Sequence, residues 1–202
     1  MRQPIEARLY LLFTPELCLG NPWDMLQEAI KGGVDLVQWR IESKDPDGLA
    51  RCLSICTESE VPVIVNDFPE LAVEQGAAGA HVGQKDLPAH EARNQLGPHR
   101  WLGISTHDID QAHAACDAGA DYLGFGPCFP TPTKGYSQGQ PSGALGDILA
   151  AIDRPVFAIG GINEETLPSL LAQGCTRIAV SSAILHADDP RTAARTLRDL
   201  LP

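Results

Sequence analysis

The sequence predicts a single domain over residues 1–202 that folds as a closed (β/α)₈ barrel, a TIM barrel. Short apolar runs alternate along the chain with segments whose apolar residues recur at helical spacing. The apolar runs are continuous, as expected for parallel strands that are covered on both faces. With 202 residues, 44% of them hydrophobic, the chain is long enough to bury one sizeable core. An open, doubly wound sheet is the main alternative.

Eight apolar runs are predicted to be strands: Arg8–Phe13, Leu36–Arg40, Val63–Asn66, Gly79–Val82, Trp101–Ile104, Tyr122–Phe125, Val156–Ile159 and Arg177–Val180. The segments between them are predicted to be helical, including Trp23–Lys31, Asp47–Glu58, Pro88–Leu96, Asp108–Ala118, Glu164–Ala172 and Pro190–Leu201. Several of these segments open on Asp, Asn or Pro, which are signals for a helix start.

A repeat favours the closed barrel over the open sheet. Four helix-like segments end in a glycine just before the second, fourth, sixth and eighth strands, at Gly33, Gly76, Gly119 and Gly174. A helix C-cap with positive φ requires such a glycine. The spacings are 43, 43 and 55 residues, so the period is two strand–helix units. The longer last interval indicates an inserted loop after the sixth strand, and such insertions carry function more often than scaffold.

The composition excludes several classes of partner. The net charge of −11 and the pI of about 4.8 make nucleic acid or an anionic membrane surface poor partners. The first residues lack the features of a signal peptide, and no run approaches the roughly 18–20 apolar residues of a membrane span. The six cysteines lack C-x-x-C spacing, so reduced thiols and a cytoplasmic location are expected. The sequence leaves an oligomer possible.

The inserted loop lies in the stretch Asp121–Gly143. Three prolines stiffen it ahead of its only cation, Lys134. Thr131 and Thr133 add two hydroxyls beside this ammonium group, a set that suits an anion carried by a small molecule. The alternative is a proline-rich surface loop with incidental threonines.

Polar residues also follow the second strand, where barrels of this type carry their chemistry. Alternation points Gln38, Arg40 and Glu42 the same way. An arginine at a strand end beside an amide donor suits bidentate phosphate binding, although a lone arginine is usually a surface ion pair.

Two carboxylates follow adjacent strands. Asn66 and Asp67 end the third strand, and Asp86 follows the fourth. Taken alone, an Asn-Asp pair after a strand is more often a simple turn. Together, Asp67 and Asp86 would sit at one mouth, where two carboxylates and a ligand phosphate are the usual ligands of Mg²⁺.

The remaining strand ends offer donors for a second anion. Ser105 follows the fifth strand near His107, which is a possible base or a residue of the helix start. Gly160-Gly161 follows the seventh strand and leaves its backbone N–H groups bare, and Ser181-Ser182 opens a helix after the eighth. The last two pairs match the phosphate site that these barrels often carry.

These residues predict two anion sites at the carboxyl ends of the strands, a metal-assisted pyrophosphate site and a monophosphate site. Such a pair of sites favours a transferase that releases pyrophosphate. No nucleophile–base–acid triad is evident. The protein would position two phosphorylated substrates and stabilise the charge of the departing group.

The sequence resembles the thiamine-phosphate synthase family over nearly its full length. The segments that carry the resemblance are VQWR, VIVNDFPELA, GAHVGQKDLP, GISTH, DYLGFGPCFPTPTK, PVFAIGGI and AVSSAI. The family is a (β/α)₈ barrel that joins hydroxymethylpyrimidine pyrophosphate to hydroxyethylthiazole phosphate, with release of pyrophosphate by a dissociative course. The resemblance therefore implies a Mg²⁺-dependent transferase of thiamine biosynthesis acting on small phosphorylated substrates.

The resemblance also implies roles for individual residues. The pyrimidine pyrophosphate would be held by Gln38, Arg40, Asn66, Ser105 and Lys134. Of these, Arg40, Ser105 and Lys134 are the expected catalytic residues. Asp67 and Asp86 would bind Mg²⁺. The thiazole phosphate would be held by Thr131, Thr133, Gly161, Ser181 and Ser182, with Gly160 shaping the turn.

Two departures from the family pattern stand out. Glu42 occupies the position of the family's lysine after the second strand, and Lys44 could substitute if the loop bends. The first strand ends Phe13-Thr14-Pro15 where Thr-Asp is common. Two other functions remain open: a thiazole tautomerase on the same barrel, with His107 as base, or a non-catalytic phosphate-ligand binder disabled at Glu42.

Overall fold

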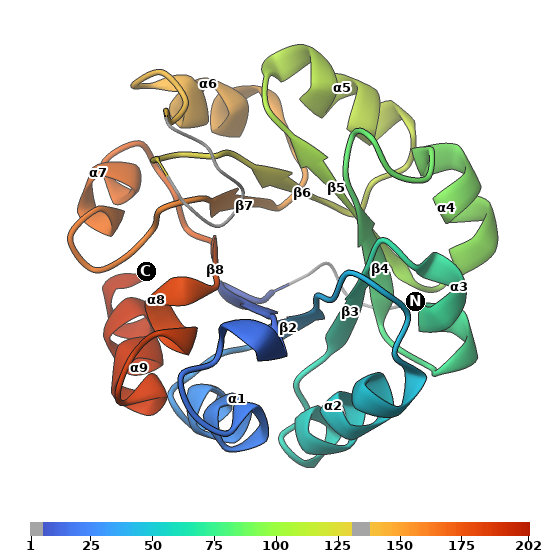
Figure 1. The fold of residues 1–202 in the computed structure, drawn as a ribbon. Coiled ribbons are helices and arrows are strands. Elements are labelled where there is room, and N and C mark those ends of the chain that lie inside the picture. Colours follow the sequence, from blue (N-terminus) through green and yellow to red (C-terminus); the bar gives the residue numbers. More distant parts are fainter. Residues whose placement is uncertain (1–5, 131–137) are drawn as a thin grey trace.

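The computed structural model describes residues 6–130 and 138–202. Its eight parallel strands close into a barrel in sequential order, with helices around the outside (Figure 1). This confirms the predicted fold class. The strands are β1 (Leu9–Phe13), β2 (Leu36–Trp39), β3 (Val63–Asn66), β4 (Gly79–Val82), β5 (Trp101–Thr106), β6 (Tyr122–Phe125), β7 (Val156–Ile159) and β8 (Ile178–Val180).

The outer layer consists of helices that connect successive strands. They are α1 (Pro22–Lys31), α2 (Pro46–Glu58), α3 (Pro69–Glu74), α4 (Ala89–Leu96), α5 (Ile109–Asp117), α6 (Ala144–Ala151), α7 (Leu167–Leu171), α8 (Ser182–Leu185) and α9 (Pro190–Leu200). A 3₁₀ turn, η1 (Pro15–Leu17), follows β1. No helix within residues 6–130 and 138–202 is long and apolar enough to cross a bilayer.

Local sequence signals account for several helix ends. Asn21, Asp45, Asp108 and Asp189 cap α1, α2, α5 and α9 by accepting hydrogen bonds from backbone N–H groups of the first turn. All four repeat glycines have positive φ, between 72° and 110°, which confirms their predicted role at helix ends.

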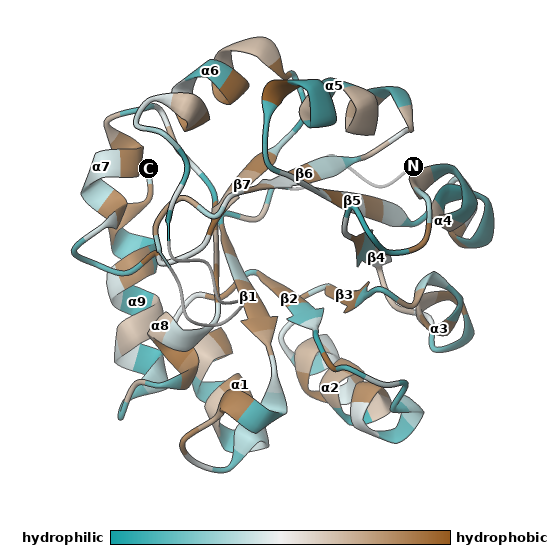
Figure 2. Cartoon of the chain, turned by 45° about the horizontal axis from the view of Figure 1, so that its top comes forward, coloured by the Kyte–Doolittle hydropathy of each residue, from teal (hydrophilic) through white to brown (hydrophobic). Residues whose placement is uncertain are grey.

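The hydrophobic core has two parts. The larger part lies between the barrel wall and the helices, and the smaller fills the barrel interior around Tyr10, Tyr122 and Phe157. Figure 2 shows the apolar strands surrounded by helices with more hydrophilic outer faces. Within the part of the chain that the structure describes, the buried polar side chains are Gln38, His81 and Thr106, and all three belong to strands. The barrel interior therefore combines packed aromatic rings with a few buried polar side chains.

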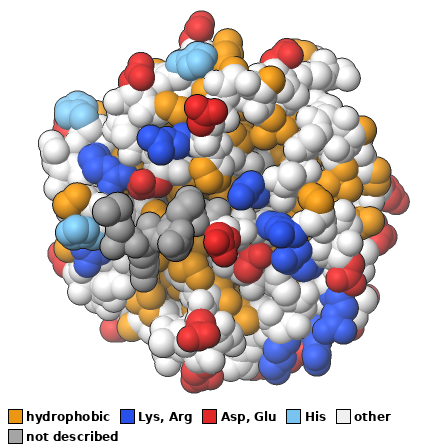
Figure 3. Space-filling view, turned by 180° about the vertical axis from the view of Figure 1, so that it is seen from behind, with side chains coloured by type: hydrophobic (Ala, Val, Ile, Leu, Met, Phe, Trp, Pro, Cys, Tyr) orange, Lys and Arg blue, Asp and Glu red, His pale blue; other side chains and the backbone are white. Residues whose placement is uncertain are grey.

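Charge is dispersed over one face of the molecule. In Figure 3, seen from the side opposite to Figure 1, acidic and basic side chains are interspersed with hydrophobic ones. Such a surface does not form the continuous basic stripe of a nucleic-acid binder.

Candidate active site

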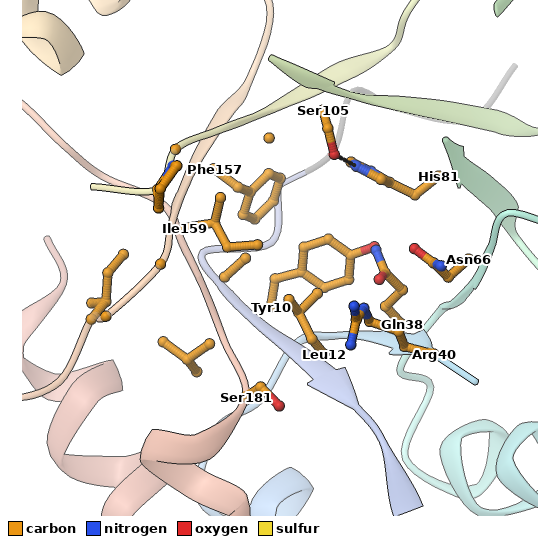
Figure 4. Close-up of a pocket in the computed structure, with 18 of the residues that line it drawn as sticks. Tyr10, Leu12, Gln38, Arg40, Asn66, His81, Ser105, Phe157, Ile159 and Ser181 are labelled. Atoms are coloured by element: carbon orange, nitrogen blue, oxygen red, sulfur yellow. Dashed lines mark hydrogen bonds between the residues drawn. The ribbon is translucent and has the colours of Figure 1, made fainter. Parts of the chain in front are cut away.

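A pocket opens at the carboxyl ends of the strands and is shown in Figure 4. Most of the predicted site residues that the structure describes line it: Gln38, Arg40, Asn66, Ser105, Gly160, Gly161, Ser181 and Ser182. Gln38, Arg40 and Asn66 lie together on one side, and Ser181 lies across the pocket from Ser105. The structure therefore brings predicted residues from five strands to one cavity.

The second strand contributes the only Lys or Arg side chain that lines the pocket within the described residues. This is Arg40, whose backbone N–H donates to the carbonyl of Phe13 at 3.0 Å, which continues the β1–β2 pairing beyond the strand. Gln38 is only 3% exposed, and its amide nitrogen donates to the Tyr10 hydroxyl at 2.8 Å. Glu42 is exposed and is not among the lining residues, so the alternation expected from Gln38 to Glu42 ends at Arg40.

The two candidate metal ligands are not among the residues that line the pocket, although Asp67 directly follows Asn66, which is. Asp67 has a φ of 63°, a left-handed conformation that is uncommon outside glycine and that often marks functional sites. Its Oδ2 accepts a hydrogen bond from Nδ2 of Asn66 at 2.5 Å, and its backbone N–H donates to the carbonyl of His81 at 2.8 Å. Asp86 is exposed, and its Oδ2 accepts from the backbone N–H of Gly83 at 2.8 Å.

This donor set fits a hard cation. Asp67 and Asp86 follow β3 and β4, which pair directly in the barrel. No group of three or more His, Cys, Asp or Glu suited to a metal occurs in the described part of the chain. Two carboxylates without further protein ligands are what Mg²⁺ takes when water and phosphate oxygens complete its shell.

The fifth strand presents Ser105 to the pocket between two partners. Its hydroxyl is 2.9 Å from Nε2 of His81, and its carbonyl accepts from the side chain of Gln84 at 2.6 Å. His107 also lines the pocket, but its Nδ1 lies 2.6 Å from the carbonyl of Gly126. Because a carbonyl only accepts, Nδ1 of His107 carries a proton in this contact.

The predicted phosphate side combines two glycines in left-handed conformations with a buried hydroxyl group. Gly160 and Gly161 have φ of 95° and 64°, so both positions favour glycine. A Cβ at Gly160 would also lie 2.6 Å from Cβ of Pro127, in the loop after β6. The Ser181 hydroxyl is buried and has no hydrogen-bond partner among the described residues. A buried orphan hydroxyl at a pocket wall suits a polar ligand.

The loop after β6 is tied to the same wall. Cys128 and Phe129 donate from their backbone N–H groups to the carbonyls of Ile159 and Gly160, at 2.7 and 3.0 Å. Thr131, Thr133 and Lys134 lie outside the described residues. Their predicted roles therefore stay predictions.

Sequence reasoning missed three polar residues of the pocket wall and barrel interior: Tyr10, His81 and Tyr122. Tyr10 and His81 line the pocket. Each belongs to a strand, and the polar residues that sequence reasoning singled out lay at strand ends. The available signal was a His inside an otherwise small and apolar strand, Gly79–Val82.

Comparison with known proteins identifies the family. A family model described as thiamine monophosphate synthase matches residues 9–184. A thiamine-phosphate synthase of Mycobacterium bovis is 40% identical over 214 residues, covering 97% of this chain and 95% of the relative. The chain belongs to the thiamine monophosphate synthase family. This confirms the resemblance seen in the sequence.

Solved structures agree with that membership. The thiamine phosphate pyrophosphorylase from Pyrococcus furiosus has a TM-score of 0.85 at 29% identity, covering 96% of this chain and 94% of that one. A 3-hexulose-6-phosphate synthase also superposes, with a TM-score of 0.69 at 18% identity over 96% of this chain and 100% of that one. At that identity the second match supports the fold alone.

Proposed function

We propose that the protein is a thiamine-phosphate synthase, which joins hydroxymethylpyrimidine pyrophosphate to hydroxyethylthiazole phosphate and releases pyrophosphate. Family membership supports this reaction. The observation that carries it is the lining of a single pocket. Arg40 and Gln38 form one wall, and Gly160, Gly161 and Ser181 form another. Two separate polar walls suit two phosphorylated substrates.

Arg40 and Ser105 bind the pyrophosphate of the first substrate. The guanidinium group pairs with phosphate oxygens in a bidentate manner, and the hydroxyl donates to another. Gln38 and Asn66 hold the pyrimidine side, because their amides can both donate and accept. Lys134, outside the described residues, completes this half as predicted.

Asp67 and Asp86 would hold Mg²⁺ in this proposal. Bound Mg²⁺ would neutralise charge on the pyrophosphate and so make it a better leaving group. Asn66 supports the arrangement, since its amide donates to Oδ2 of Asp67 at 2.5 Å and fixes the direction of that carboxylate.

The second wall binds the thiazole phosphate. The N–H groups of Gly160 and Gly161 and the hydroxyls of Ser181 and Ser182 supply donors without bringing a full charge. Binding of a phosphate would give the buried hydroxyl of Ser181 the partner that it otherwise lacks. Thr131 and Thr133 add the donors predicted from the sequence.

The chemistry requires no protein nucleophile. The bond between the pyrimidine methylene carbon and the bridging oxygen breaks, and the electron pair leaves with pyrophosphate. The thiazole nitrogen then donates its electron pair to that carbon and forms the new C–N bond. Arg40, Ser105 and Lys134 stabilise the charge on the departing oxygens, and the pocket holds the two rings in line and excludes water.

Pyrophosphate release tests the proposal. The purified full-length chain with both substrates and Mg²⁺ is expected to release pyrophosphate, and omission of either substrate or chelation of the metal is expected to stop it. Arg40→Ala should lower kcat/KM by about 100-fold or more. Conversion of a single thiazole phosphate without pyrophosphate release would support a tautomerase instead. Binding of both substrates without turnover would refute the proposal.

In this proposal, Glu42 does not prevent substrate binding or catalysis. Its side chain is exposed and lies outside the pocket lining. Lys44 forms an ion pair with Glu70 at 2.5 Å and lies over the ring of Phe68, with its ammonium group 5.7 Å from the ring centroid. The proposed cytoplasmic location rests on the sequence, in which the six cysteines lack C-x-x-C spacing.

A further inference from the structure

A line of hydrogen bonds crosses the barrel along the wall of the pocket from β2 to β5. Its members, which we call the relay, are in order Gln38, Tyr10, Tyr122, His81 and Ser105. The successive separations are 2.8 Å, 3.0 Å, 3.2 Å and 2.9 Å. Figure 4 shows the Ser105 and His81 end, with Tyr10 and Gln38 meeting near the middle of the pocket. Both ends of the relay line the pocket, so the relay connects two of its walls.

The protons of the relay have a direction. The amide nitrogen of Gln38 only donates, so the Tyr10 hydroxyl accepts there. The proton of Tyr10 then goes to Tyr122, its other hydrogen-bond neighbour among the described residues. The reverse order would leave the proton of Tyr10 buried without an acceptor, which is costly.

The same reasoning fixes the tautomer of His81. Tyr122 accepts from Tyr10, so its own proton goes to Nδ1 of His81. That nitrogen is then the acceptor, and the ring proton sits on Nε2 and is donated to the Ser105 hydroxyl. The hydroxyl of Ser105 therefore accepts a hydrogen bond from His81, and its own proton can be donated to a ligand.

Both tyrosines are able to keep their protons for this purpose. Burial in the barrel raises the pKa of Tyr10 and of Tyr122 well above the usual range. Their rings pack against Phe157 with centroids 5.2 and 5.6 Å away, so no solvent reaches the phenols from that side. Each hydroxyl therefore has one proton to give at any ordinary pH.

The barrel wall leaves space for the relay at one glycine. Gly103 on β5 is paired with His81 on one neighbouring strand and with Tyr122 on the other. A Cβ at Gly103 would lie 2.1 Å from Cζ of Tyr122 and 2.4 Å from Nδ1 of His81. Any larger residue there would occupy the place of the contact between the two side chains.

We propose that Tyr10, Tyr122 and His81 are positioning residues that set the hydrogen-bonding pattern of the pocket. They hold Gln38 with its amide oxygen toward the ligand as an acceptor, and Ser105 with its hydroxyl proton toward the ligand as a donor. The acceptor at Gln38 suits a ligand ring that carries an amino group. The donor at Ser105 suits an anionic or lone-pair acceptor on the opposite side of the ligand. This ligand class rests on the proposed function, whereas the order of protons does not.

The tautomer of His81 is the first test. Ring ¹⁵N NMR of the ligand-free full-length protein, with His81 assigned by its loss in His81→Asn, is expected to show an Nε2–H tautomer. In Tyr122→Phe the single tautomer should give way to a mixture, because Nδ1 loses its donor. Phe157→Leu, which alters packing on the same rings without removing a hydrogen bond, should leave the tautomer unchanged. An Nδ1–H tautomer or an imidazolium in the wild-type protein would overturn the proposal.

Ligand discrimination is the second test. Binding of a 4-aminopyrimidine diphosphate and of its 4-oxo analogue is compared by calorimetry in the wild type and in Tyr10→Phe. The wild type should prefer the amino compound, and the preference should fall by about tenfold in Tyr10→Phe, because the Gln38 amide is free to turn. An unchanged preference would overturn the positioning role. Failure of pyrophosphate release would instead count against the proposed function and leave the NMR result intact.

Discussion

Gly103→Ala is the substitution that most directly tests how the barrel interior is built. A Cβ at this position would lie 2.1 Å from Cζ of Tyr122, 2.4 Å from its hydroxyl and 2.4 Å from Nδ1 of His81. Tyr122 is fully buried and His81 is 8% exposed, so neither side chain can swing into solvent to relieve the clash. The neighbouring strands must move apart, or the relay must break.

The magnitude follows from these two costs. Overpacking a tight core costs about 1–3 kcal/mol. Separating Tyr122 from His81 disturbs two hydrogen bonds of the relay, each contributing about 1 kcal/mol. The total loss of unfolding free energy is therefore about 3–5 kcal/mol, a large fraction of the stability of a typical domain.

Equilibrium urea unfolding followed by circular dichroism measures this loss. For Gly103→Ala the midpoint should fall by about 1–2 M urea. Gly146→Ala is the matched control, because Gly146 lies inside α6 and its Cβ would approach nothing closer than 3.8 Å. The control should gain about 0.5–1 kcal/mol from helix propensity. Equal stability of Gly103→Ala and the wild type would refute the reasoning.

Four further predictions concern other parts of the molecule. Asp67→Asn and Asp86→Asn should each lower Mg²⁺-dependent pyrophosphate release by about 100-fold, measured as kcat over a metal titration. Lys44→Ala should change the affinity for the pyrophosphate substrate less than about twofold, because its ammonium group is engaged with an exposed carboxylate. Arg93→Ala should lower the unfolding free energy by about 2 kcal/mol at unchanged kcat, because its guanidinium group holds three backbone carbonyls and a carboxylate far from the pocket. Alkylation of Cys18 should accelerate about tenfold per pH unit up to pH 10, because burial, with a smaller contribution from a neighbouring carboxylate, raises its pKa to about 11.

Each of these predictions has a control and a contrary outcome. For the aspartates, full activity at saturating Mg²⁺ would show that they do not bind the metal. A large loss of affinity in Lys44→Ala would restore the idea that this residue replaces the family's lysine. Arg195→Ala removes an exposed arginine from α9 and should leave stability within about 0.5 kcal/mol of the wild type. For Cys18, a rate that levels off near pH 8.5 would indicate an ordinary thiol.

The strand pattern could be predicted because the strands are short, largely apolar runs bounded by turn residues. Four of the eight strands, among them β3 and β6, have the expected bounds. Three helices, α3, α6 and α8, have no counterpart among the helical ranges that the sequence predicts. The six residues of α3 and the four of α8 are too few for a helical period to be recognised, although Ser181-Ser182 was expected to open a helix. The eight residues of α6 follow the inserted loop, and their N-cap, Gly143, makes no side-chain hydrogen bond.

Only the part of the candidate site that consists of polar residues at strand ends could be predicted from the sequence. Gln38, Arg40 and Ser105 were found because a barrel gathers strand ends at one rim, whatever the exact register. The relay could not be found in this way. Tyr10 and Tyr122 are 112 residues apart and belong to strands that are not neighbours in the barrel, so their contact depends on how the closed barrel is staggered.

The pocket resolves an apparent conflict between the net charge and the proposed ligands. The chain has 26 acidic residues and a net charge of −11, yet no Asp or Glu is among the described residues that line the pocket, and Arg40 is. Surface carboxylates are screened over about 8 Å at physiological ionic strength, so they reach a ligand in the pocket only weakly. Neutral donors that are already oriented, such as the hydroxyl of Ser105 and the N–H groups at Gly160, gain strength where water is excluded. Affinity for phosphorylated substrates can thus arise locally in an acidic protein. It depends on hydroxyl groups whose protons are directed toward the ligand, and the proposed role of the relay is to orient the hydroxyl of Ser105 in this way.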